Sequence, residues 1–528
     1  MVDHGYLALL LHAHLPYVRH PEHDEFLEED WLYEAITETY LPLLDIFWKL
    51  ADEAVPFRVT LSLTPTLCHM LRDPLLQDRY ARYLHRSIAL AARECERTRG
   101  QDPLEDTTRF YLRRLEHLRS AYELRWKRDL VSAFAQLQDA GFLEIITCAA
   151  THGFLPLLEH QPEAVRAQIR IACDHYQEMF GRAPRGIWLP ECAYVSSLDD
   201  VLRDANLRWF VVDSHGLMFG SPRPRYAIYA PCFTPAGPAA FARDRDSSRQ
   251  VWSAEEGYPG DPAYRDFYRD IGLELSAEYL RDFLPTDGSR RFTGLKYHRV
   301  TGRGQEKDWY RRGWAMGAAD HHAGHFMASR AAQIANLRTH MNVPPIVLSP
   351  FDAELFGHWW FEGPEFLDWF LRKSVYDQKE YRLTTPSEYL AGQNTLQLVA
   401  PSSSSWGHKG YWEVWLDDCN SWIYPHLHAA ARRMTQSARA HAGTSSPLTE
   451  RTLRQMAREL LLAQASDWAF LMKTGTARSY ATKRTNDHLL RFNRLFDQLH
   501  AQNVEEPFLT NCEWRDNLFP NLDWKHYL

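Results

Sequence analysis

The chain lacks both long apolar runs and blocks of like charge. In its 528 residues no apolar run reaches the roughly 18 residues that a transmembrane helix needs, so we expect no membrane partner. The 60 Lys and Arg residues are interspersed with 68 Asp and Glu residues, and without a basic stripe nucleic acid is not an expected partner. The first residues carry no basic segment typical of a signal peptide, so we expect a cytoplasmic protein.

Short motifs that bind metals or phosphate, or that activate a serine, are also missing. The eight cysteines form no CxxC pair and no zinc-type spacing, which indicates free thiols in a reducing compartment. The chain has no GxGxxG or GxxxxGK[ST] loop for phosphate and no GxSxG serine motif. We therefore expect no cofactor.

Aromatic residues, in contrast, are abundant. The 18 Trp, 25 Tyr and 26 Phe residues make up 13% of the chain. Aromatic side chains in such numbers either fill a large core or form flat platforms for a ligand, and composition alone leaves both open.

Short apolar segments alternate with segments of helical period through the first three quarters of the chain. Segments of strand type are 6–11, 58–63, 143–147, 186–189, 209–212, 292–295 and 346–348. Helices are predicted at 30–54, 162–180 and 364–376, the last two beginning with a proline in the first turn. This alternation predicts an α/β fold with a mostly parallel sheet, closed or open, and helices outside it.

Two regions depart from this alternation. Residues 75–140 are charged and helical with no strand between them, so we expect a helical insertion there. The serine-rich stretch 401–405 is predicted to be a linker or loop, and helices alone follow it, notably at 448–472 and 485–503. The chain is therefore divided into an α/β unit at 1–74 and 141–400, the insertion at 75–140 and a helical C-terminal domain at 401–528.

Polar residues follow the apolar runs where the strands are expected to end. In a β/α barrel the carboxyl ends of all strands meet on one face, so residues far apart in sequence would share a site there. A single His or Asp after a strand is most often a turn or cap residue, but five such runs together make that interpretation improbable. The residues concerned are His12, His14, His152, Glu191, Asp213 and Asp352.

Glu191 and Asp352 follow different strands, as glycosidic chemistry requires. One carboxylate would act as nucleophile or base and the other as the acid that protonates the leaving oxygen.

Two weaker patterns favour metals instead. His321 and His325 are spaced as a helical pair, and Asp213 with His215 could begin an Asp-His-His site of the carbohydrate deacetylase kind.

Four longer motifs carry a resemblance to a known family. The segments HAHLPY at 12–17, WLPECAY at 188–194, LSPFDAELFGHWW at 348–360 and RELLLAQASDW at 458–468 resemble conserved regions of glycoside hydrolase family 57. The resemblance covers nearly the whole chain and is greatest to the family's 1,4-α-glucan branching enzymes. It implies an incomplete seven-stranded (β/α)7 barrel with a helical insertion, and an all-helical C-terminal domain that contributes to the glucan site.

The resemblance also implies roles for individual residues. Glu191 matches the family's nucleophile and Asp352 its general acid/base, in a retaining reaction that moves an α-1,4-glucan chain onto a 6-hydroxyl as an α-1,6 branch. Tyr226 matches a loop-tip tyrosine that is important for transfer, with Tyr229 as the alternative. The substrate-binding residues expected in all are His12, His14, Trp31, His152, Asp213, Tyr226, Trp360, Trp406, Trp415 and Asp467.

The tryptophans near these motifs are expected to stack on glucose rings, whose C–H faces suit an indole. We expect an α-1,4-glucan as donor and acceptor, no metal in the site, and a monomer or small homo-oligomer. Two activities of the same family stay open, namely an α-glucan hydrolase and a 4-α-glucanotransferase. From other classes, a silent glucan-binding protein and a metal-dependent deacetylase are disfavoured by the two carboxylates.

Overall fold

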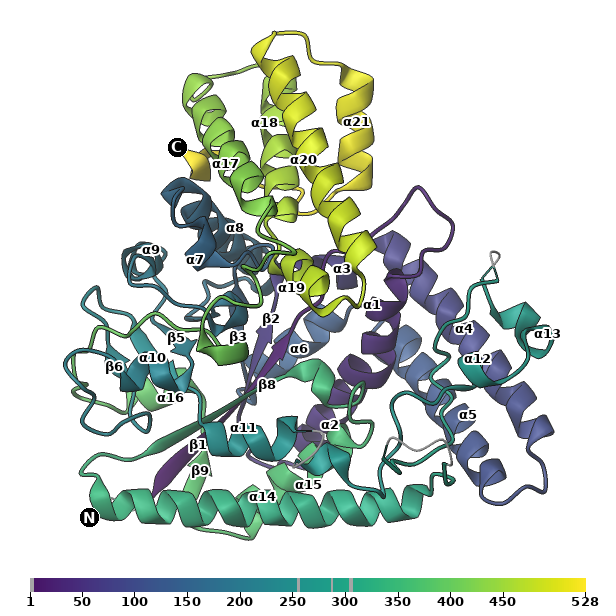
Figure 1. The fold of residues 1–528 in the computed structure, drawn as a ribbon. Helices are drawn as coiled ribbons and strands as arrows, with labels where there is room; N and C mark the ends of the chain where they lie inside the picture. Colours follow the sequence, from purple (N-terminus) through teal and green to yellow (C-terminus); the bar gives the residue numbers. More distant parts are fainter. Residues whose placement is uncertain (1–3, 254–256, 286–287, 303–306) are drawn as a thin grey trace.

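The structure, a computed structural model, describes residues 4–253, 257–285, 288–302 and 307–528. Within these residues a mostly parallel sheet of nine strands forms the centre of the molecule (Figure 1). The longest strand has the sequence GYLALLLHA and is buried along nearly all of its length, as expected for a parallel strand covered on both faces. The parallel strands of the barrel itself are β1 (Gly5–Ala13), β2 (Val59–Leu63), β3 (Leu143–Cys148), β4 (Gly186–Trp188), β5 (Trp209–Val212), β7 (Ala239–Ala242) and β8 (Ile346–Asp352).

The sheet closes into an incomplete barrel. Its parallel strands run in the order β7-β5-β4-β3-β2-β1-β8, so β7 and β8 are the two ends. Immediately after β7, Arg243 forms a parallel bridge with Leu348 of β8, and the Asp244 amide donates to the Leu348 carbonyl at 2.8 Å. Two short strands lie beside this ring: β6 (Cys232–Phe233) is antiparallel to β7, and β9 (Tyr381–Leu383) pairs with the start of β1. The predicted (β/α)7 barrel is confirmed.

Six of the seven predicted strands are present, and the prediction at 292–295 is wrong. That segment has no strand structure, and it leads to Lys296, whose carbonyl accepts a hydrogen bond from Tyr111 of the helical insertion at 2.7 Å. The strand that takes its place in the barrel is β7, with the sequence AAFA. Alanine has a low strand propensity, so this segment gave no strand signal in the sequence.

Helices surround the barrel. The predicted helix 30–54 is α1 and α2, joined by a π-helical turn at Ile36–Tyr40, and α14 runs along the lower side of the molecule in Figure 1. Of the described helices, none has the length and hydropathy needed to cross a membrane. The helices around the barrel are α1 (Glu29–Ala35), α2 (Leu41–Asp52), α3 (Pro65–Arg72), α6 (Leu130–Asp139), α7 (Leu155–Leu158), α8 (Pro162–Phe180), α9 (Leu198–Asp204), α10 (Ser214–Met218), α11 (Arg245–Trp252), α14 (Arg312–His340), α15 (Gly363–Tyr376) and α16 (Pro386–Ala391).

The predicted insertion consists mainly of a helical hairpin, α4 (Pro74–Arg97) and α5 (Leu104–Ser120). It lies beside a second excursion of the chain between β7 and β8, which contains α12 (Ile271–Glu274) and α13 (Ala277–Leu280) (Figure 1). The two are tied at Glu94, which accepts hydrogen bonds from Tyr279 at 2.7 Å and Tyr297 at 2.8 Å. The sequence did not indicate this second excursion, because its helices are too short to show a period.

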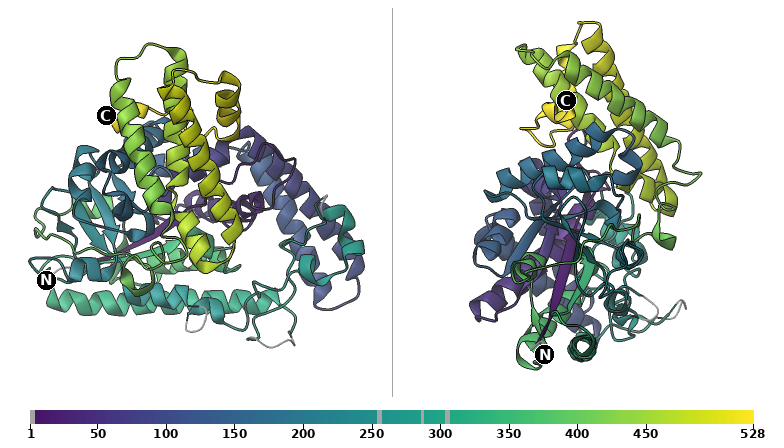
Figure 2. Two further views of the ribbon diagram at one scale, coloured as in Figure 1. Left: turned by 45° about the horizontal axis from the view of Figure 1, so that its top comes forward. Right: turned by 90° about the vertical axis from the view of Figure 1, so that its left-hand side faces the viewer.

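The C-terminal helices form a bundle that stands over the barrel (Figures 1 and 2). Its members are α17 (Ile423–Ala440), α18 (Pro447–Ala463), α19 (Ser466–Thr474), α20 (Arg478–His500) and α21 (Glu506–Arg515). The predicted helix 448–472 is broken after Ala463, because Ala465 pairs with Gly153 of the barrel. The serine-rich stretch is a loop as predicted, yet it is fixed to the barrel. The Tyr194 amide donates to the Ser404 carbonyl and the Ser402 amide to the Gly216 carbonyl, both at 2.8 Å.

Candidate active site

The residues predicted after the strands lie at the carboxyl end of the barrel. His12 is on β1 next to Asp352, the last residue of β8, and next to Ser62 of β2. His14 follows β1, His152 follows β3, Glu191 follows β4 and Asp213 directly follows β5. The barrel topology therefore gathers side chains from five strands on the face that the C-terminal bundle covers.

Glu191 is held in a tight turn by groups from the C-terminal part of the chain. Its backbone has φ 60° and ψ 22°, a left-handed conformation that is rare for a non-glycine residue and typical of functional sites. Trp406 donates its indole N–H to Oε2 at 2.9 Å, and Ser466 donates its hydroxyl to Oε1 at 3.1 Å. Burial raises the pKa of Glu191, whereas these two donors favour its ionised form.

Asp352 has a different environment. Burial raises the pKa of its carboxyl group well above the usual range, and the nearby carboxylates of Glu354 and Glu191 raise it further, against the opposing charge of Arg243. Among the described residues, no donor hydrogen-bonds to its carboxylate. The two buried carboxyl groups of the site therefore differ: Glu191 is the one prepared for ionisation and Asp352 the one prepared to hold a proton.

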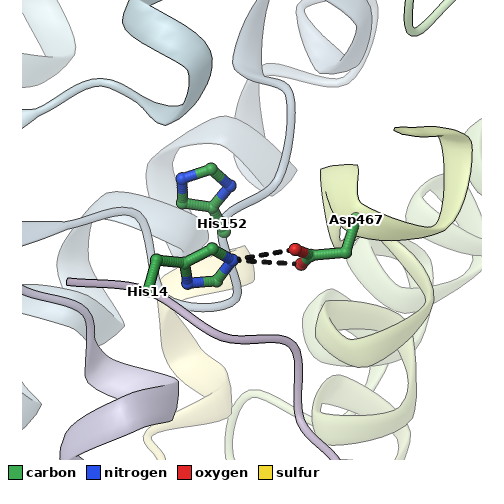
Figure 3. Close-up of side chains that lie close together, drawn as sticks. All are labelled: His14, His152 and Asp467. Carbon is green, nitrogen blue, oxygen red and sulfur yellow. Dashed lines mark hydrogen bonds and ion pairs between the residues drawn. The ribbon is translucent and has the colours of Figure 1, made fainter. Parts of the chain in front are cut away.

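Three histidines and Asp467 form the wall between β1, β3 and α19. Figure 3 shows two of these histidines, His14 and His152, together with Asp467. The rings of His14 and His152 stack with centroids 3.8 Å apart, and His14 Nε2 is paired with Asp467 at 3.0 Å. His152 places Nδ1 2.8 Å from the Ser466 hydroxyl and Nε2 3.1 Å from His12 Nε2. Burial lowers the pKa of His12 and His152 well below the usual range. Burial acts the same way on His14, but Asp467 outweighs it and raises the pKa of that ring.

This cluster has the residue types of a metal site but not the free nitrogen atoms. His14, His152 and Asp467 lie close enough to share an ion. Both ring nitrogens of His152, however, already face protein partners, so its lone pair is not directed at a common point with the other two ligands. The helical pair suggested at 321 and 325 is also not assembled as a metal site: His325 Nδ1 meets the Tyr258 hydroxyl at 2.7 Å.

Asp213 is linked to the site through other side chains. Burial alone would raise the pKa of its carboxyl group, but the contacts with His215, at 2.9 Å, and with Arg243, at 3.3 Å, lower it. Arg243 in turn lies over the Trp406 ring, 5.9 Å from its centroid. Asp213 therefore reaches the site through Arg243 and Trp406 and does not form the Asp-His-His set of a deacetylase.

Of the tryptophans expected to bind sugar, two are partly exposed and two are buried in the core. Trp406 is half-buried beside Glu191, and Trp31 is half-buried against Tyr480. The expectation that Trp360 and Trp415 stack on sugar is not supported, because they are only 2% and 1% exposed. Phe366 packs on Trp360 with centroids 4.8 Å apart, and Phe154 stacks on Trp415 at 4.6 Å, so these indoles fill the core.

The loop that carries Tyr226 lies at the opposite end of the barrel. The Tyr226 hydroxyl donates to Asn342, which precedes β8, and the carbonyl of Tyr229 accepts from the amide of Ile346, the first residue of β8. A strand of seven residues is about 20 Å long and separates this loop from Asp352. The structure thus brings neither tyrosine into the site, which corrects the expectation for both.

Four contributors were not selected from the sequence. Ser466, Glu354 and Arg243 stand beside motif or strand-end residues, so a search for polar neighbours would have found them. Trp252 at the end of α11 is 39% exposed and meets Trp406 edge-on with centroids 6.3 Å apart. No local pattern marks Trp252, since only the closure of the barrel brings α11 to Glu191.

The sequence of this chain is similar to known families and enzymes. The family model described as glycosyl hydrolase family 57 matches residues 8–344, and the one described as 1,4-alpha-glucan branching enzyme, C-terminal, matches residues 426–527. A 1,4-alpha-glucan branching enzyme of Thermococcus kodakarensis is 33% identical over 98% of this chain and 77% of its own length. A probable 1,4-alpha-glucan branching enzyme of Mycobacterium tuberculosis is 30% identical, covering 98% and 97%.

Two solved structures superpose on nearly the whole chain. The alpha-amylase AmyC from Thermotoga maritima has a TM-score of 0.93 at 44% identity and covers 99% of both chains. The family 57-type branching enzyme from Pyrococcus horikoshii has a TM-score of 0.88 at 33% identity and covers 99% of this chain and 97% of its own. Fold and sequence thus agree over the barrel and the C-terminal bundle alike.

Proposed function

Because the chain belongs to glycoside hydrolase family 57, we propose that it is a 1,4-α-glucan branching enzyme that works by a retaining double displacement. The observation that carries the proposal is the unlike environment of two buried carboxyl groups at the same end of the barrel. Glu191 accepts two hydrogen bonds that favour its carboxylate, whereas burial and, after it, the like charges nearby favour the protonated form of Asp352.

These environments assign the roles. The Glu191 carboxylate attacks the anomeric carbon of an α-1,4-linked glucose, and the bond to the leaving oxygen breaks as Asp352 gives that oxygen its proton. The glucan is then an ester of Glu191. In the second step the 6-hydroxyl of an acceptor chain gives its proton to Asp352, its oxygen takes the anomeric carbon, and Glu191 is released as a carboxylate.

The other site residues are proposed to bind the glucan. Trp406 and Trp31 offer partly exposed indoles for the C–H faces of sugar rings. The wall beside Glu191 offers ring nitrogens and carboxylate oxygens to the hydroxyl groups of the sugar. It is lined by His12, His14, His152 and Asp467. Asp213 supports Trp406 through Arg243.

Transfer, as opposed to hydrolysis, is supported by the C-terminal part of the chain. The segment after residue 400 supplies Trp406, Ser466 and Asp467 to the site, and the bundle that follows matches the branching-enzyme C-terminal model. An α-glucan hydrolase is the second candidate, favoured by the 44% identity to the Thermotoga maritima alpha-amylase. The eight free cysteines favour the cytoplasm as the location of this protein.

Linkage analysis tests the proposal. The protein is incubated with amylose, the product is treated with a debranching enzyme, and released chains are sized. New short chains that appear only after debranching support branching, whereas reducing sugars without debranchable linkages support the hydrolase. Asp352→Asn is expected to lower turnover by about 10²–10⁴-fold, the usual contribution of a general acid. Glu191→Gln is expected to abolish the glycosyl ester in mass spectra of the trapped protein.

A further inference from the structure

The strand end that carries Asp352 holds a second buried carboxyl group, which the mechanism above does not use. Glu354 lies in the short 3-10 turn Ala353–Leu355, two residues after Asp352, and is 9% exposed. Its Oε1 accepts a hydrogen bond from the Tyr40 hydroxyl at 2.5 Å and one from the His14 amide at 3.2 Å. Two segments that are distant from Glu354 in sequence thus donate to one carboxylate oxygen.

The partner Tyr40 is fixed by the backbone around it. It is the last residue of the π-helical turn Ile36–Tyr40, a rare geometry that is often found at functional sites. The loop after Glu354 packs directly on this turn at Gly357, where a Cβ atom would lie 1.8 Å from the carbonyl oxygen of Glu38. Since only glycine fits there, the turn and the loop have one relative position, and the Tyr40 hydroxyl is held on Glu354.

The charges around Glu354 set how readily it ionises. Burial raises its pKa to about 7, while the bonds from Tyr40 and His14 act in the opposite direction. Its carboxyl group is therefore expected to ionise in the neutral pH range. The other ionisable groups that face this corner are Asp352 on β8, Glu191 after β4, Arg243 after β7, Asp467 through His14, and the Cys68 thiol beside Tyr40.

Of the charged side chains around Asp352, Glu354 raises the pKa of its carboxyl group most. After burial it is the largest cause that raises the pKa of the Asp352 carboxyl group, ahead of Glu191, and Arg243 opposes it only in part. A like charge disfavours loss of the Asp352 proton, and once that proton has gone it makes the carboxylate a stronger base. One interaction therefore serves both halves of a double displacement.

We propose that Glu354, oriented by Tyr40, is a positioning residue that keeps the proton on Asp352 until the leaving oxygen takes it and then helps Asp352 recover a proton from the acceptor. Glu354 itself neither gains nor loses a proton in the cycle: the proton passes from Asp352 to the leaving oxygen and returns from the acceptor hydroxyl. The inference rests on the role given to Asp352 under the proposed function.

The pH profile of kcat/KM tests it. Glu354→Gln keeps the size of the side chain and an oxygen for Tyr40 but removes the charge, so the alkaline limb is expected to move to lower pH by about one unit. The acidic limb, which belongs to Glu191, is expected to stay. Tyr40→Phe withdraws the hydrogen bond that favours the charged form of Glu354, and a smaller shift in the same direction is expected.

Tyr33→Phe is the matched control. Tyr33 is also buried, on the preceding helix α1, and its hydroxyl donates to Glu29 at 2.9 Å, a bond of the same kind outside the site. This variant is expected to leave both limbs in place.

Infrared difference spectra of wild type and Asp352→Asn, titrated with and without Glu354→Gln, report the Asp352 carboxyl band directly and do not depend on turnover.

The outcomes separate this inference from the proposed function. If Asp352→Asn retains full activity, the role of Asp352 and the proposed function fail. If Asp352→Asn is inactive while Glu354→Gln and Tyr40→Phe keep the wild-type alkaline limb and carboxyl band, the inference about Glu354 alone is overturned. Should Glu354→Gln not yield folded protein, Tyr40→Phe measured against Tyr33→Phe decides the matter.

Discussion

Replacement of Trp406 by phenylalanine gives the sharpest test of how the nucleophile is prepared. The substitution keeps an aromatic ring next to Glu191 but removes the indole N–H that donates to Oε2 at 2.9 Å. A hydrogen bond to a charged group is worth about 1.5–3 kcal/mol. Because one pKa unit corresponds to about 1.4 kcal/mol, loss of the donor is expected to raise the pKa of Glu191 by about one to two units.

The sign and the pH range follow from the role of Glu191. The nucleophile must be ionised, so a higher pKa moves the acidic limb of kcat/KM to higher pH by the same one to two units. On that limb the rate falls by about 10–100-fold, since one unit is a factor of ten. On the plateau the loss is expected to be much smaller, because the charge leaves the carboxylate in the transition state and the hydrogen bond does not strengthen there.

The assay is the initial rate on a short chromogenic maltooligosaccharide across pH, which reports cleavage without the complication of polymer products. Trp524→Phe is the matched control, because Trp524 also donates its indole N–H to a glutamate, Glu450 Oε2 at 2.7 Å, but within the C-terminal domain. Ser466→Ala removes the other donor to Glu191 and is expected to shift the limb in the same direction. An acidic limb unmoved by Trp406→Phe, or moved equally by Trp524→Phe, would refute the reasoning.

Three further predictions concern stability and cofactors. Gly357→Ala is expected to lower the free energy of unfolding by at least about 2 kcal/mol, because the added Cβ would lie 1.8 Å from the Glu38 carbonyl; an unchanged denaturation midpoint would contradict this. Asp467→Asn removes the partner that raises the pKa of His14, so it is expected to lower the free energy of unfolding by about 2 kcal/mol below pH 6.5, and by less as the pH rises through the raised pKa of His14. Equal losses in unfolding titrations at both ends of that pH range would refute the pairing. Activity should persist in excess EDTA, because both ring nitrogens of His152 face protein partners, and loss of turnover that Zn²⁺ restores would show a metal site.

Residues at strand ends were predictable because the rule that places them is topological. The apolar run of β1 and the polar residues His12 and His14 that follow it need only the statement that parallel strands end on one face. Glu191 and Asp352 were found in the same way. The positions of these side chains depend on the barrel as a whole and not on details of packing.

Loops and helix breaks were not predictable to the same degree. The break between α18 and α19 comes from a pairing of Ala465 with Gly153, about three hundred residues away in sequence, and no helix-stop signal marks it. The burial of Trp360 and Trp415 likewise depends on which aromatic rings pack on them. Tyr226 shows the same limit, since the end of the barrel to which its loop folds is decided by contacts with Asn342 that lie outside the loop.

That helix break also explains why the barrel does not complete its own site. At the break the Ser466 amide donates to the carbonyl of His152 at 3.0 Å, which sets the start of α19 against the end of β3. From this position the Ser466 hydroxyl reaches Glu191, while Trp406 reaches the same carboxylate from the loop fixed to the barrel. For Asp352, in contrast, burial is the main cause of the raised pKa, and the charged side chains that add to it or oppose it, Glu354, Glu191 and Arg243, all belong to the barrel. The difference between the two carboxyl groups, on which a retaining reaction depends, therefore arises because the segment after residue 400 hydrogen-bonds to one of them and not to the other.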